Sequence, residues 1–126
     1  MQQHLYEYAV IRFVPKVERE EFLNVGLILF CKRNRYLRVQ YQICPRRFTA
    51  FQPSIEVGEL EETLAHFQAI AAGRKEAGRI GMLDVPERFR WLTAVRSATV
   101  QTSRPHPGIC KHLDETFERL FRELVL

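Results

Sequence analysis

The sequence lacks the common catalytic signatures. It has no Gly-rich phosphate loop, no dinucleotide-binding glycine motif, no HExxH zinc motif and no GxSxG nucleophile elbow. Its four histidines are scattered along the chain without the spacing of a zinc site. The sequence therefore predicts no metal site and no cofactor, and it favours a non-enzymatic protein.

Long apolar runs and paired cysteines are also missing. No apolar stretch approaches the roughly 20 residues that a membrane helix needs, and the first residues lack the pattern of a signal peptide. The three cysteines are odd in number and have no CxxC spacing, so no disulfide framework is expected. These absences predict a cytoplasmic protein that does not engage a membrane.

The composition is that of an ordinary globular chain. Its 126 residues, 46% of them hydrophobic, predict a single domain spanning the whole sequence. The net charge of +4 permits a polyanionic partner without requiring one.

The strands are predicted from apolar patterning. Residues 25–31 are unbroken apolar sequence after an acidic turn, which indicates a buried central strand. Residues 6–14 are rich in aromatic and β-branched side chains, and residues 36–43 alternate between apolar and polar like a half-exposed strand. Residues 97–102 are a candidate last strand.

Three helices follow from capping signals and helical periodicity. They are expected at 55–72 with Ser54 as the cap, at 86–94 after a capping box that begins at Asp84, and at 112–125. Residues 75–83 and 103–108 are predicted to be loops. The fold class is therefore α+β, with an antiparallel sheet of three to four strands and two to three helices packed on it.

The hairpin after the central strand has a predicted register. A tight turn centred on Asn34 and Arg35 would set Cys31 opposite Arg38 and Cys44 near Val25.

A candidate polar site lies at the entrance to the central strand. Arg12 is a cation on a mostly apolar strand face, so either its head reaches solvent or it needs a carboxylate, for which Glu21 is the preferred partner. Gly26 indicates a bulge or a close backbone approach, which either aims Asn24 at a ligand or ends the loop. An enzyme would use Glu21 as acid/base, Asn24 as orienting group and Arg12 as anion clamp.

The arginines form several groups, and one set is a candidate anion-binding surface. Separate groups on loops are commonly a solvated surface, but groups that converge could hold phosphates. The candidate residues are Arg33, Arg35, Arg38, Arg46 and Arg47.

The sequence resembles a known family over nearly its whole length. Residues 8–15 (YAVIRFVP) with 21–26 (EFLNVG) are similar to the opening of the bacterial DUF3037 family of unknown function. Residues 100–103, 107–108, 120–121 and 125 are similar to its ending. The resemblance implies no activity, but it implies an accessory role beside a kinase-like neighbour of the toxin–antitoxin kind. The matching positions, which extend the candidate polar site, are Arg12, Pro15, Glu21, Asn24, Gly26, Gln101 and Ser103.

Two functions of different kinds remain open. The first is a non-enzymatic protein-interaction or accessory module, in which the edge of the half-polar strand 36–43 binds a partner chain or a second copy forms a homodimer. The alternative is a nucleic-acid or phosphate-binding domain that uses the arginine groups.

Overall fold

The computed structural model describes residues 2–94, 96 and 98–126. The strands are β1 (His4–Phe13), β2 (Leu23–Cys31), β3 (Tyr36–Tyr41), β4 (Val100–Thr102) and β5 (His106–Cys110). The α-helices are α1 (Pro45–Ala50), α2 (Val57–Ala72), α3 (Gly78–Gly81), α4 (Val85–Leu92) and α5 (Leu113–Leu124). Two short 3-10 turns, η1 (Val17–Arg19) and η2 (Lys75–Ala77), complete the described elements.

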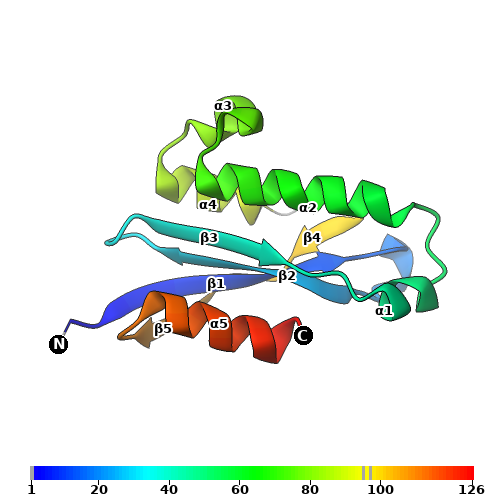
Figure 1. Cartoon of the computed structure of the whole chain (residues 1–126), viewed down its shortest axis with the longest axis horizontal. Coiled ribbons are helices and arrows are strands. Elements are labelled where there is room, and N and C mark those ends of the chain that lie inside the picture. Colours follow the sequence, from blue (N-terminus) through cyan, green and yellow to red (C-terminus); the bar gives the residue numbers. More distant parts are fainter. Residues whose placement is uncertain (1, 95, 97) are drawn as a thin grey trace.

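The strands form one antiparallel sheet between two helical layers. The order is β3-β2-β1-β4, and β5 also pairs with β1, along the edge that β4 uses. Helices α2, α3 and α4 lie on one side of the sheet, and α5 crosses the other (Figure 1). The predicted α+β class is confirmed, although the sheet has five strands and the short helices add to the expected number.

The predicted central strand lies in the middle of the sheet. β2 pairs with β1 on one side and β3 on the other, and all its residues except Asn24 are buried. Successive side chains of β2 point to opposite faces of the sheet and so belong to two separate cores. Ile28 and Phe30 pack towards α2, whereas Leu27 and Leu29 pack towards α5.

β5 was missed by the sequence, since 103–108 is predicted to be a loop. Pro107 and Gly108 look like turn residues, yet both fit a strand at the sheet edge. Proline is tolerated on an edge strand where its missing N–H faces solvent. Glycine is required opposite Tyr6, because a Cβ on Gly108 would lie 2.4 Å from Tyr6 Cζ.

The hairpin register also differs from the prediction. Cys31 lies opposite Tyr36, and Arg38 lies opposite Leu29. The loop has four residues, 32–35, and closes with the left-handed Arg35 at φ 50°, so the pairing moves by two positions. In this register Gln42, not Cys44, bonds the Val25 carbonyl.

Several helix boundaries differ as well. α2 begins at Val57 after Glu56, and α4 begins after Asp84, and neither preceding residue makes a side-chain cap bond. The predicted loop 75–83 contains η2 and α3. Of the predicted strand 97–102, residues 100–102 form β4 and residues 98 and 99 are bends, while residue 97 lies outside the described residues. In the described part of the chain, no helix is long and apolar enough to cross a membrane.

Candidate functional site

Three residues of the predicted polar site lie in one row across the sheet. Arg12 of β1 pairs with Asn24 of β2 on one side and with Gln101 of β4 on the other. Cross-strand partners project from the same face. That face is the α5 side, because Asn24 Nδ2 donates to the Leu124 carbonyl at the end of α5 (3.0 Å). The fold therefore joins positions that are far apart in the sequence.

Arg12 contacts an aromatic ring, which neither of the two predicted alternatives, a solvent-exposed head or a carboxylate partner, included. Its Cζ lies 4.1 Å from the centroid of Phe22, which is 45% exposed. A cation over an exposed ring gains about 0.5–1 kcal/mol. The Arg12 Nε is buried and has no hydrogen-bond partner in the described part of the chain.

The preferred pairing of Arg12 with Glu21 was wrong. Glu21 is exposed and bonds Arg19, and no ion pair of the described residues joins it to Arg12. The left-handed Glu20 (φ 57°) bends the chain so that Glu21 turns back to Arg19. The hydrogen bond from Arg19, together with its charge, lowers the pKa of Glu21. Glu21 is thus a surface carboxylate and not a base positioned beside Arg12.

Asn24 and Gly26 belong to a β-bulge, as the glycine predicted. The register between β1 and β2 shifts between Ile11 and Arg12, so Val25 is the extra residue. A Cβ on Gly26 would lie 3.0 Å from Ile11 Cδ1 and 3.1 Å from the Gln40 carbonyl oxygen. The bulge aims Asn24 at α5, where its amide fixes the end of the helix.

Ser103 and Gln101 hold the far edge of β1. Ser103 is buried, and its Oγ accepts the Val10 N–H (2.9 Å) and donates to the Arg104 carbonyl (3.1 Å). This hydroxyl replaces a backbone partner where the chain passes from β4 to β5. Gln101 Nε2 donates to the Ala98 carbonyl (2.8 Å). Both residues therefore have local structural partners.

The predicted anion-binding arginines do not gather in one place. Arg33 and Arg35 lie in the hairpin loop, whereas Arg46 and Arg47 lie on α1 at the opposite end of β3 (Figure 1). Arg35 pairs with Asp84 (2.9 Å).

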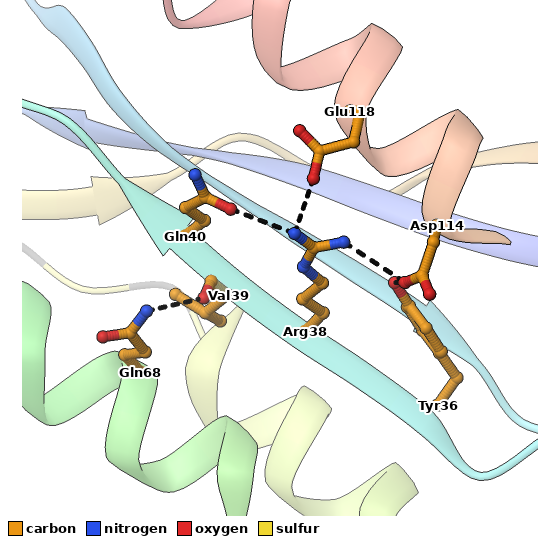
Figure 2. Close-up of polar contacts among 7 residues, drawn as sticks. All are labelled: Tyr36, Arg38, Val39, Gln40, Gln68, Asp114 and Glu118. Carbon is orange, nitrogen blue, oxygen red and sulfur yellow. Dashed lines mark hydrogen bonds and ion pairs between the residues drawn. The ribbon is translucent and has the colours of Figure 1, made fainter.

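Arg38 already has acidic partners on α5. Its guanidinium bonds Asp114 (3.2 Å) and Glu118 (2.7 Å) (Figure 2). Its Cζ also lies 4.1 Å from the Phe117 ring centroid. The Tyr36 hydroxyl donates to the same Asp114 carboxylate (2.7 Å). Arg38 thus fastens α5 to β3, and two carboxylates compensate its charge.

Tyr36 gives this junction a predicted pH dependence. Burial, followed by the hydrogen bond to Asp114, raises the pKa of Tyr36 from 10.0 to about 12. The folded chain therefore holds the phenol proton more tightly than the unfolded chain. The contribution of Tyr36 to the free energy of unfolding should be constant below pH 10 and should be lost as the pH rises from 10 towards 12.

Urea unfolding across this alkaline range checks the prediction. Tyr36→Phe should flatten the decline, whereas the control Tyr41→Phe should retain it. An equally steep decline in Tyr36→Phe would assign the effect to other groups.

The outer edge of β3 presents backbone groups away from the sheet. The Gln42 N–H bonds the Val25 carbonyl, so Gln42 faces β2. Because the backbone groups of successive residues point to opposite sides of a strand, the N–H and carbonyl groups of Leu37, Val39 and Tyr41 point away from β2. The Val39 carbonyl confirms this direction, since it accepts a hydrogen bond from Gln68 Nε2 of α2 (3.3 Å; Figure 2).

A groove of about 300 Å³ runs between this edge and α2. We call it the β3 groove. Its α2 wall consists of the small side chains Ala71 and Ala72 beside Gln68, and Arg74 lies at one end. Of these residues, Ala72 and Arg74 are exposed.

A comparison with family models gives one match. The model described as "Protein of unknown function (DUF3037)" matches residues 8–125. The chain belongs to this family. No curated protein matches the chain, and no solved structure matches it.

Three of the resemblance positions hold the sheet and α5 of this DUF3037 chain together. Gly26 forms the bulge, Asn24 fixes α5, and Ser103 joins β4 to β5. Arg12 and Glu21 do not, because the Arg12 guanidinium lies over Phe22 without an acidic partner in the described ranges, and Glu21 bonds Arg19 at the surface.

Sequence reasoning missed the residues that contact β3 in this DUF3037 chain. Gln68 lies 29 positions from Val39, and Asp114 and Glu118 lie 76 and 80 positions from Arg38. The predicted helices 55–72 and 112–125 contain these three residues, but helical periodicity does not show which strand a side chain contacts.

Proposed function

We propose that this DUF3037 protein is a non-enzymatic interaction module that binds an extended partner segment along β3. The observation that carries the proposal is the outer edge of β3 with the groove beside it. Leu37, Val39 and Tyr41 present backbone groups at the two-residue repeat that an added strand would match.

The Gln68 amide supports this mode of binding. It donates to the Val39 carbonyl, the same acceptor that the N–H of an added strand would use. At 3.3 Å the bond is long for N–H···O, so a partner amide could replace it at small cost. Gln68 then protects an edge that is otherwise open to any chain.

The groove also indicates the chemistry of the partner segment. Side chains that face α2 would meet Ala71 and Ala72, which leaves room for apolar residues of moderate size. An acidic residue at one end would meet Arg74. The family resemblance makes a kinase-like neighbour the first partner to test.

Filling the groove should abolish partner capture. Ala72 is exposed on its wall, so Ala72→Arg should change stability by less than about 0.5 kcal/mol while obstructing the added strand. We expect at least a tenfold loss of affinity, about 1.4 kcal/mol. Capture from the native host, followed by titration of the captured protein, measures it.

The matched control is Ala98→Arg, an exposed alanine next to β4 at the far edge of the sheet. A partner that binds both variants equally would contradict the β3 site. A chain that captures nothing from its host would contradict the interaction function itself.

The nucleic-acid alternative receives less support from the geometry. Arg19, Arg35 and Arg38 are engaged by carboxylates, and the remaining candidate arginines lie at opposite ends of β3. It stays a prediction, and binding to DNA or RNA at low salt would test it.

A further inference from the structure

The edge opposite β3 is formed by β5. The hydrogen bonds of β1 show which residues of β5 direct their backbone groups away from the sheet. Val10 directs both its N–H and its carbonyl to Ser103. The backbone N–H and carbonyl groups of successive residues point to opposite sides of β1, so those of Tyr8, Tyr6 and His4 also point towards β5. Their partners in β5 are then bonded to β1, and the alternating residues Pro107 and Ile109 face outward. The missing N–H of Pro107 agrees with this assignment.

Two large apolar side chains stand exposed at this edge. Leu5 is 69% exposed and Ile109 is 62% exposed, and the two are cross-strand partners on one face. Among the large apolar side chains that the structure describes, Met82 alone is more exposed. An unpaired strand with an apolar pair is the type of edge that associates unless it is covered.

We propose that a second copy of this chain covers the β5 edge by antiparallel pairing of β5 with β5. A two-fold axis at Ile109 sets this residue opposite Ile109 of the second copy. Leu5, Ile109 and their two counterparts then form one continuous apolar row across four strands. Such an interface is self-complementary, as a two-fold dimer requires.

Proline selects this register among the alternatives. An axis at Pro107 would place two residues without an N–H opposite each other, and both central hydrogen bonds would be lost. With the axis at Ile109, each Ile109 donates to and accepts from its counterpart. The Pro107 carbonyl can also accept from the N–H of Lys111, which follows β5 directly.

Charge complementarity supports the same register. Glu7 is the cross-strand partner of Pro107. The two-fold axis sets Lys111 of the second copy beside Pro107, which is two strand spacings, or about 10 Å, from the Glu7 backbone. A lysine and a glutamate side chain span that distance, and the ion pairs of the described residues include neither Glu7 nor Lys111.

Sedimentation of the full chain over a concentration series tests the proposal. Wild type should form a dimer, and Ile109→Lys should raise its dissociation constant at least tenfold, because it sets two like charges directly opposite each other across the paired edges. Met82→Lys is the control, since it replaces a still more exposed apolar side chain on a different part of the surface. A wild type that is monomeric at every concentration would overturn the proposal, as would a dimer that Ile109→Lys leaves intact.

Charge exchange tests the register with residues that cannot disturb the core. Glu7→Lys and Lys111→Glu should each weaken the dimer, and the double variant should restore it. Failure of the double variant to restore dimerisation would overturn the register centred on Ile109. Because β3 lies at the other edge, Ala72→Arg should leave the dimer unchanged.

Discussion

Replacing Phe117 with alanine is expected to lower the free energy of unfolding by about 3–5 kcal/mol, the usual cost of removing a buried phenylalanine. Phe117 is fully buried and lies at the centre of the core between α5 and the sheet. Its ring stacks on Phe121 at 6.1 Å between centroids and lies beneath the Arg38 guanidinium. The substitution would leave a cavity and would remove the surface that positions Arg38.

Phe22→Ala is the matched control, because it removes the same side chain from a site that is 45% exposed. Its contact with Arg12 is expected to contribute no more than about 1 kcal/mol. Urea unfolding of the three proteins gives both differences. Equal losses in the two variants would show that the packing of α5 contributes little to the fold.

The importance of α5 was apparent in the sequence, because its apolar spacing is consistent with one buried face. The buried central strand was apparent for a similar reason, since an unbroken apolar run of this length is typical of a strand covered on both faces. Patterns of this kind show which residues of a segment are buried. They do not report which element provides the cover.

β5 shows where such reasoning fails. Pro107 and Gly108 have the local signature of a turn, and they form a strand because β1 leaves an edge to which they fit. Tyr6 occupies the space over Gly108, and Pro107 directs its nitrogen outward. Neither condition can be read until the sheet order is known.

The candidate site was predictable only where it depends on local sequence. Asn24 and Arg12 are close in sequence, and the bulge between them follows from Gly26. The pairing of Arg12 with Glu21 failed because proximity in sequence does not determine the direction of a turn. Gln68 was not predicted because its contact with Val39 depends on how α2 lies over the sheet.

Arg88→Met is expected to lower the free energy of unfolding by about 2–4 kcal/mol, because it leaves carbonyl groups at the end of α2 without their charged donor. Arg88 Nη1 donates to the Ile70 and Ala71 carbonyls at 3.0 and 2.8 Å, and its Nε donates to the Leu83 carbonyl at 3.0 Å. This guanidinium joins α4 to the end of α2 that carries Ala71 of the β3 groove. Methionine keeps most of the apolar stem and removes only the donors.

Arg90→Met is the control, since Arg90 lies two residues away on α4, is exposed, and its side chain makes no hydrogen bond in the described part of the chain. Urea unfolding should separate the two variants by at least about 2 kcal/mol, and Arg88→Lys should fall between them because one ammonium cannot reproduce the planar set of donors. If Arg88→Met behaves like Arg90→Met, the end of α2 is held by Gly73 and its backbone bond to the Ile70 carbonyl, and α4 only covers it. A large loss in Arg88→Met would instead show that α4 stabilises the α2 wall of the β3 groove. The affinity for a partner strand at β3 would then depend on both helices.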